Sequence, residues 1–334
     1  MVTACRILGT SPRSSPLAAS IRSLCRTYSS STTGGRVQLV FDHHAPPKSD
    51  RHRQDAPIIF MHGLFGSKKN NRTVSKVLAR DLNRHVYAID LRNHGESPHA
   101  DRHDYVAMAD DVAGFISEHG LKEPSLIGHS MGAKTAMTLA LDQPSLISDI
   151  VSVDNAPIDA TLSRSFATYI RGMRHIDDAN VTRQSEADSI LTSYEPDIHI
   201  RQFLLGNAHR VAVPSSSSSS SSANNNNNGD EEANQKQRTT KNVVKFRIPL
   251  DILARNLDNL GDFPFRNPDE SRFEKPALFV RGTHSKYVPD EAIPVIGRFF
   301  PRFSLVDIEA GHWVISEKPA EFLKAVIEFL TPKE

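Results

Sequence analysis

Short apolar runs alternate with helix-like segments along most of the chain. Runs of strand length, rich in branched and aromatic side chains, occupy residues 37–41, 57–61, 85–90, 125–128, 149–153, 277–281 and 303–308. Helical periodicity is found in residues 74–82, 105–119, 131–141, 290–299 and 320–330. Strands that alternate with helices in this way predict an α/β fold, in which a mostly parallel sheet has helices on both faces.

The alternation stops after Asp154 and resumes near residue 273. Residues 157–272 are mostly helical in pattern with polar faces, which predicts a helical cap inserted after the strand that ends at Asp154. The sheet domain would then comprise residues 37–156 and 273–334. Inside the cap lies a tract of serines and asparagines, and its few apolar side chains cannot offset the entropy of ordering it. We therefore expect a disordered insertion at about residues 214–240.

The N-terminal segment has the composition of a targeting sequence. The first 41 residues contain no Asp or Glu, and five arginines are spread among many serines. We expect residues 1–36 to be a mitochondrial transit peptide and disordered leader, which places the protein in the mitochondrion, in the matrix. An untargeted tail is the other reading. Both cysteines, Cys5 and Cys25, lie in this segment, so the mature protein would have no disulfide and no cysteine-based site.

Overall charge and hydropathy limit the kinds of partner that the sequence predicts. Forty basic and 39 acidic side chains give a net charge of +1, which makes no electrostatic case for nucleic acid or an anionic membrane. No continuous apolar run reaches the 18 residues or so of a membrane span, so no transmembrane segment is predicted. We expect a small-molecule partner, and the sequence predicts neither a cofactor nor a metal site.

The clearest chemical motif is Gly128-His129-Ser130-Met131-Gly132, a G-x-S-x-G sequence between a predicted strand and a predicted helix. In this context the serine occupies a strained turn with its hydroxyl exposed, and the glycines let neighbouring backbone approach. This predicts Ser130 as a nucleophile and the alpha/beta-hydrolase fold as the architecture. A glycine-flanked serine that only caps a helix is the alternative.

A second loop, His62 to Gly66, follows the run at residues 57–61. In this fold, that loop and the residue after the nucleophile each supply one backbone N–H to the oxyanion hole. The predicted donors are the amides of Leu64 and Met131. An ordinary turn at the end of a strand is the alternative reading of the loop.

The base is expected late in the chain, because the order in this fold is serine, acid, histidine. His312 lies in Gly311-His312-Trp313, between the last predicted strand and the last predicted helix. Other histidines fit less well. His129 adjoins the nucleophile but should point elsewhere, and His62 and His94 are interpreted as packing or hydrogen-bonding residues.

The acid departs from the commonest pattern, in which an aspartate lies shortly after the glycine that follows the penultimate strand. That glycine is Gly282, and residues 283–286 contain no carboxylate. Asp154, at the end of the strand after the nucleophile helix, lies at the correct sheet edge and keeps the chain order, so it is the predicted acid. Asp290, at the start of the following helix, is the rival.

Five segments together resemble one branch of the alpha/beta-hydrolases. That branch includes fungal mitochondrial ethanol acetyltransferases, animal mitochondrial abhydrolase-domain proteins and a small bacterial esterase group. The segments are His62–Ser67, Asp90–His99, Gly128–Lys134, Val153–Pro157 and Gly311–Trp313. Asp90-Leu91-Arg92-Asn93-His94-Gly95 is the most specific of them, and we expect its charges to brace loops around the site. In the branch the acid follows the strand after the nucleophile helix, which agrees with Asp154.

A serine, histidine and aspartate at these places imply acyl transfer through a covalent acyl-enzyme. Water as acceptor would make an esterase or thioesterase, and an alcohol would make an ester synthase. The resemblance implies short acyl groups, with acetyl-CoA and ethanol as one possible pair. It also leaves a different role open, that of a partner or protector of another mitochondrial protein with secondary hydrolase activity. A serine variant that retained the cellular function would favour that role. Lipase action on a lipid surface is a further alternative, although no long apolar lid is evident.

Overall fold

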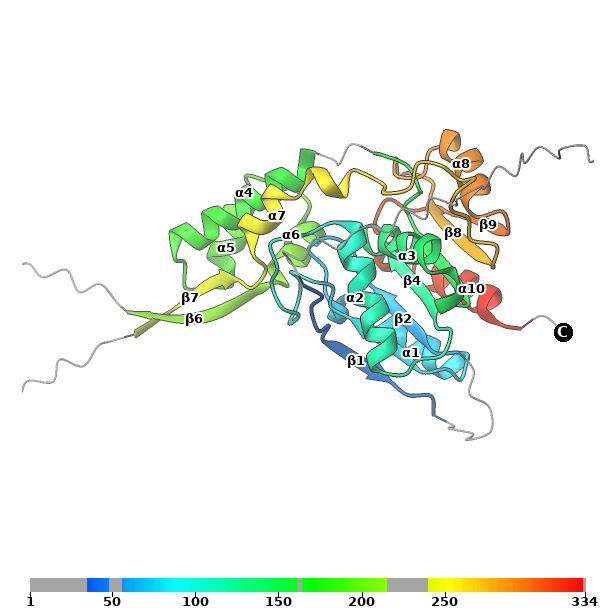
Figure 1. The fold of residues 1–334 in the computed structure, drawn as a ribbon. Helices are drawn as coiled ribbons and strands as arrows, with labels where there is room; N and C mark the ends of the chain where they lie inside the picture. The colour runs from blue at the N-terminus through cyan, green and yellow to red at the C-terminus, as the bar shows by residue number, and fades with distance from the viewer. Residues whose placement is uncertain (1–34, 48–55, 161–163, 215–239, 333–334) are drawn as a thin grey trace, which may run out of the picture. The chain divides into compact units, whose positions relative to one another are not determined.

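Seven strands form the main sheet of the part of the chain that is described. The computed structural model describes residues 35–47, 56–160, 164–214 and 240–332. The strand order is β1-β3-β2-β4-β5-β8-β9 (Figure 1). β1 is antiparallel to β3, and every other neighbouring pair is parallel. The bounds are β1 Phe41–His44, β2 Ile58–Met61, β3 Val86–Ile89, β4 Ser125–His129, β5 Asp149–Val153, β8 Ala277–Gly282 and β9 Phe303–Ile308. The predicted mostly parallel sheet is confirmed.

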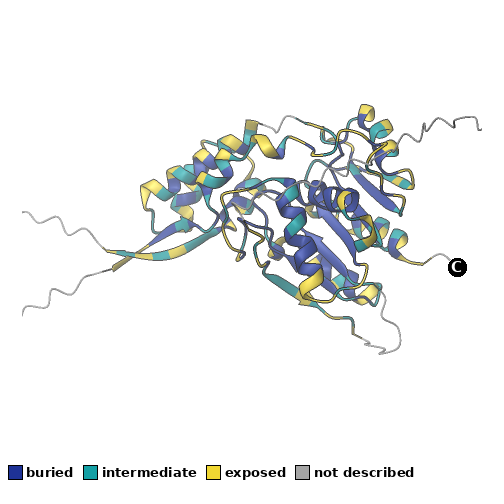
Figure 2. Cartoon of the chain, in the orientation of Figure 1, coloured by how far each residue is buried: buried dark blue, intermediate teal, exposed yellow. Residues whose placement is uncertain are grey.

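Helices cover both faces of this sheet. In β2, Ile58 and Phe60 join one apolar cluster and Ile59 and Met61 join the other, because successive side chains of a strand point to opposite faces. Helices α1 and α10 belong to the first cluster, and α2, α3 and α8 to the second. Their bounds are α1 Arg72–Asp81, α2 Tyr105–Glu118, α3 Met131–Asp142, α8 Ile293–Phe299 and α10 Pro319–Leu330. Burial on both faces explains the apolar runs of the central strands β2, β3, β4, β5 and β8, and Figure 2 shows the centre of the sheet in dark blue.

The first strand begins later than the sequence pattern predicts. Residues 37–41 alternate like a strand, but β1 starts at Phe41. The amide of Val37 donates instead to Asp111 Oδ1 at 2.8 Å, and the amide of Val40 donates to Ser97 Oγ at 2.8 Å. The amides of Val37 and Val40 thus bond to side-chain oxygens in place of the carbonyls of a neighbouring strand.

The segment between β5 and β8 forms a cap of helices and one strand pair. Its described elements are α4 Arg164–Ala179, α5 Gln184–Leu191, α6 Ile198–Leu205, β6 Ala208–Pro214, β7 Thr240–Phe246, α7 Leu250–Arg255 and the 3-10 helix η3 Asp258–Leu260. The helices agree with the predicted cap, but the antiparallel pair β6–β7 was not predicted. Polar side chains such as His209 and Arg210 interrupt β6, and no residue of β6 is fully buried, so it lacks an apolar run. Residues 215–239, which hold the predicted insertion, lie outside the described residues, as does most of the predicted leader.

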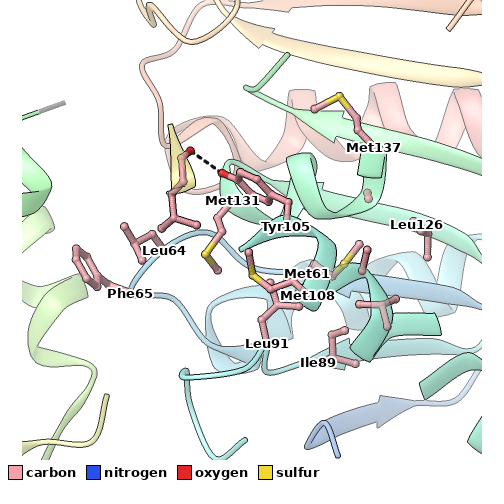
Figure 3. Packing of buried hydrophobic residues seen from close by; sticks show 14 of the residues in the cluster. Met61, Leu64, Phe65, Ile89, Leu91, Tyr105, Met108, Leu126, Met131 and Met137 are labelled. Carbon is pink, nitrogen blue, oxygen red and sulfur yellow. Dashed lines mark hydrogen bonds between the residues drawn. The ribbon is translucent and has the colours of Figure 1, made fainter. Parts of the chain in front are cut away.

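Two helices of the sheet domain hold the chain where it leaves the cap. Tyr105 donates its hydroxyl to the carbonyl of Leu260 at 2.8 Å, the dashed line in Figure 3. Lys134 donates its ammonium to the carbonyls of Gly261 at 2.9 Å and Asp262 at 3.0 Å. Burial lowers the pKa of Lys134 to about 8. Three consecutive backbone carbonyls therefore accept hydrogen bonds from side chains of α2 and α3.

Two features are absent from the described residues. None of their helices combines the length and apolar character needed to cross a membrane. They also contain no group of three or more His, Cys, Asp or Glu side chains arranged to hold a metal ion.

Candidate active site

Ser130 lies in a strained turn between β4 and α3. Its φ of 53° and ψ of −111° place a non-glycine residue in the left-handed half of conformational space, which costs on the order of 1–3 kcal/mol. The flanking glycines are required by close backbone contacts. A Cβ on Gly128 would lie 2.2 Å from the carbonyl oxygen of Gly132, and a Cβ on Gly132 would lie 2.7 Å from that of His62. The turn thus projects the Ser130 hydroxyl at the carboxyl edge of the sheet.

Three residues far apart in the sequence form one hydrogen-bonded line. His312, in the loop between β9 and the short helix α9 (Val314–Glu317), places Nε2 2.9 Å from Ser130 Oγ. Its Nδ1 lies 2.7 Å from Oδ2 of Asp154, which is fully buried at the end of β5. Such a line can carry a proton from the serine hydroxyl to the imidazole and hold the resulting cation next to a carboxylate.

The loop after β8, where the commonest pattern would place the acid, supports Asp154 instead. Ser285 Oγ donates to Asp154 Oδ2 at 2.5 Å, and the Gly282 amide donates to Oδ1 at 3.1 Å. In the commonest pattern the acid itself lies in this loop. Here Ser285 lies there instead and donates a hydrogen bond to the acid, Asp154. The rival acid, Asp290, is 83% exposed and pairs with Arg281 at 2.6 Å, so it lies outside this line.

Two backbone amides next to the serine have no hydrogen-bond acceptor within the described residues. These are the N–H groups of Leu64 and Met131, the two predicted oxyanion donors. Met131 follows Ser130 at the start of α3. Gly63 lies against the serine as well, because a Cβ on it would come within 3.3 Å of Ser130 Cβ. Unpaired donors beside a nucleophile can stabilise an oxyanion that forms there.

Two buried histidines brace the loop that carries Leu64. His62 Nε2 accepts from the Leu91 amide at 3.0 Å, so its Nδ1 carries the proton and donates to the carbonyl of Gly63 at 2.8 Å. His94 Nε2 accepts from the Phe65 amide at 3.1 Å, and Nδ1 donates to the carbonyl of Arg92 at 3.0 Å. The sequence identified both as packing or hydrogen-bonding residues, and these contacts agree with that interpretation.

The polar turn that contains His94 also contacts this loop. Asp90 accepts from both the backbone amide and the ammonium of Lys68, at 2.6 and 2.7 Å, and Arg92 forms a buried ion pair with Asp111 at 2.6 Å. The expected bracing of loops by charges at this turn is found in the structure.

The structure adds contacts around His312 and Trp313 that the sequence did not predict. His129 does point away from the serine hydroxyl, but its Nε2 donates to the backbone carbonyl of His312 at 2.8 Å. The Tyr287 ring stacks on the imidazole with 4.1 Å between ring centres, and the cap residue Phe203 packs on Trp313 at 4.5 Å. Trp313 was visible in the motif beside the base, whereas the other contacts depend on the fold.

Because several histidines are buried, the folded protein should become less stable in mild acid. Burial lowers the pKa of His62 and His94, and it lowers the pKa of His103 and His129 to about 4. Above pH 6.5 both the folded and the unfolded forms are neutral. Between pH 6.5 and 4 the unfolded chain binds protons that His103 and His129 do not bind in the folded protein, so each of these two should lower the free energy of unfolding by up to about 1.4 kcal/mol per pH unit. His62 and His94 act in the same direction, from pH 6.5 down to their own lowered pKa.

Urea unfolding at pH 7.5, 6.0 and 5.0 measures this effect. The free energy of unfolding should depend less steeply on pH in His94→Gln. The glutamine side-chain oxygen can still accept from the Phe65 amide. Equal stability of the unmodified protein at pH 7.5 and pH 5.0 would show that these histidines are not held neutral.

Comparison with known proteins agrees with this fold. A family model described as "alpha/beta hydrolase fold" matches residues 56–319. A probable alcohol acetyltransferase of Saccharomyces cerevisiae is 36% identical, over 94% of this chain and 90% of its own length. An sn-1-specific diacylglycerol lipase, ABHD11, of Xenopus laevis is 37% identical over 82% and 79%. Among solved structures, one titled "Marine microorganism esterase" aligns with a TM-score of 0.72 at 29% identity, covering 88% of this chain and 99% of its own. The resemblance read from the sequence is confirmed.

Proposed function

We propose that this chain, which belongs to the alpha/beta-hydrolase family, transfers short acyl groups from an ester or acyl-CoA through an acyl-enzyme on Ser130. The relatives support an enzyme of the hydrolase and acyltransferase kind. The observation that carries the proposal is the hydrogen-bonded line from Ser130 through His312 to Asp154, next to two amides without an acceptor among the described residues.

In the proposed reaction, Ser130 Oγ attacks the acyl carbonyl carbon while His312 Nε2 takes the hydroxyl proton. Asp154 accepts from Nδ1–H and stabilises the imidazolium. The carbonyl oxygen becomes an oxyanion that accepts from the amides of Leu64 and Met131. As the intermediate collapses, His312 protonates the leaving alcohol or thiol. Water or an alcohol then attacks the acyl-enzyme, with His312 again as base.

The surroundings of the oxyanion amides favour a short acyl group. The Leu64 and Met131 side chains are 4% and 2% exposed. They pack within the apolar cluster with Met108, as Figure 3 shows, and so do not line an open channel. Ile198 is the one large apolar side chain exposed among the described residues, which favours small dissolved substrates over a lipid surface.

The acceptor is tested by product analysis. The purified protein is incubated with acetyl-CoA, with and without ethanol, and free CoA, acetate and ethyl acetate are measured. We expect CoA release in both reactions. Ethyl acetate would identify an alcohol acetyltransferase, and acetate alone would identify a thioesterase.

Two parallel reactions complete the design, with p-nitrophenyl acetate and with dispersed diacylglycerol as acyl donors. Turnover of diacylglycerol much faster than of both acetyl donors would overturn the preference for short acyl groups. Failure to turn over any of the three donors would overturn the proposal itself.

A further inference from the structure

The loop that carries the Leu64 amide contains a strained residue, Phe65. Its φ is 61°, in the left-handed region where glycine is the usual occupant. Phe65 is the third residue of a turn closed by a 2.9 Å hydrogen bond from the Gly66 amide to the Gly63 carbonyl, and Leu64 is the second. A turn with positive φ at its third residue strongly favours glycine there. Something other than the local sequence must therefore hold this turn.

Two hydrogen bonds hold Phe65 from opposite sides. Its amide donates to His94 Nε2 at 3.1 Å, within the sheet domain. Its carbonyl accepts from Asn207 Nδ2 at 2.7 Å, a buried contact across 142 residues of sequence. The cap also contacts the Phe65 side chain, whose ring centre lies 6.0 Å from that of Phe166 on α4. The cap therefore contacts both the backbone and the ring of the strained residue.

Asn207 is itself held rigidly. It lies between α6 and β6, and its amide donates to the carbonyl of Leu204 at 3.0 Å. Its carbonyl accepts from the amide of Arg247, directly after β7, at 3.0 Å. Its side-chain nitrogen also lies 3.3 Å from the carbonyl of Leu204, so two carbonyl oxygens face the same atom. Only the NH₂ end of the amide can donate to both, which determines the side-chain orientation.

We propose that Asn207 is a positioning residue that the cap contributes to the oxyanion loop. By holding the carbonyl of Phe65, it keeps the Gly63–Gly66 turn in the strained form that directs the Leu64 amide toward the carbonyl oxygen of the acyl group. This inference rests on the proposed acyl transfer. It predicts that the loss of one hydrogen bond in the cap weakens stabilisation of the transition state and leaves substrate binding nearly unchanged.

Asn207→Ala tests the inference, together with Asn207→Leu, which keeps most of the side-chain volume if the smaller residue does not fold. With p-nitrophenyl acetate we expect kcat to fall about tenfold and KM to change by less than about twofold. Complete removal of one oxyanion donor costs about 10²–10³. The affinity for a trifluoromethyl ketone, which forms an oxyanion on the serine, should fall by the same factor as kcat/KM. Amide hydrogen exchange in residues 60–70 should become faster.

Asn256→Ala is the matched control. Asn256 also joins the cap to the sheet domain through a side-chain amide, donating to the carbonyl of Asp101 at 3.1 Å, but it does not contact the oxyanion loop. Its variant should keep kcat, ketone affinity and exchange in residues 60–70 unchanged. The inference is overturned if folded Asn207 variants behave like the unmodified protein, or if Asn256→Ala shows the same losses. If the unmodified protein forms no acyl-enzyme, it is the proposed function that fails.

Discussion

Ser130→Ala is expected to lower turnover of p-nitrophenyl acetate about 10⁶-fold with little change in folding. The hydroxyl forms the covalent bond in the proposed reaction, and no neighbouring side chain can replace it. Within the described part of the chain, the Ser130 side chain makes one hydrogen bond, to His312, and the strained φ of 53° belongs to its backbone. The melting temperature should therefore stay close to that of the unmodified protein.

Ser316→Ala is a suitable control for this loss. Ser316 donates its hydroxyl to the carbonyl of Trp313, close to the base in sequence, but takes no part in the line to Asp154. Its variant should keep normal turnover. Comparable activity in Ser130→Ala and the unmodified protein would contradict a mechanism through a serine ester.

Asp154→Asn should lower turnover by about 10⁴-fold, because an amide in place of the carboxylate favours the wrong histidine tautomer. The carboxylate accepts from His312 Nδ1 at 2.7 Å, and it also accepts from Ser285 and Gly282. An asparagine can keep some of these contacts, so the protein should still fold. Initial rates and melting temperature, measured on the same preparation, separate the two effects.

Asp290→Asn provides the matched comparison for the acid. That carboxylate is exposed, and Arg281 is its one ion-pair partner among the described residues, so turnover should change by less than about twofold. The opposite ranking of the two variants would show that the acid is wrongly assigned, while the roles proposed for Ser130 and His312 could stand.

The sheet domain was the easiest part to predict. Residues 149–153 and 303–308 coincide with β5 and β9, because apolar side chains dominate both segments and polar or turn residues mark their ends. β1 was placed too early, since its pattern does not show that Asp111 and Ser97 take the preceding amides. The pair β6–β7 was missed, because polar side chains interrupt the apolar pattern of both strands and the two strands lie on either side of a long insertion.

The candidate site was likewise predictable where its residues follow strands and not where it depends on side-chain contacts. Ser130, Asp154 and His312 could be placed because each ends a predicted strand or lies in the loop after one, and parallel strands end at one edge of the sheet. Neither the bond from Ser285 to Asp154 nor the bond from Asn207 to Phe65 could be predicted. These contacts depend on side-chain positions in loops and in the cap, for which hydrophobic periodicity carries no information.

The covalent intermediate can be observed by mass spectrometry of protein that is quenched in acid during turnover of p-nitrophenyl acetate. We predict that one acetyl group is added to the peptide that contains Ser130, that it persists longest in Asp154→Asn, and that it is absent from Ser130→Ala. Rapid ester turnover with no acetyl group at Ser130, or with the acetyl group on another residue, would contradict the account.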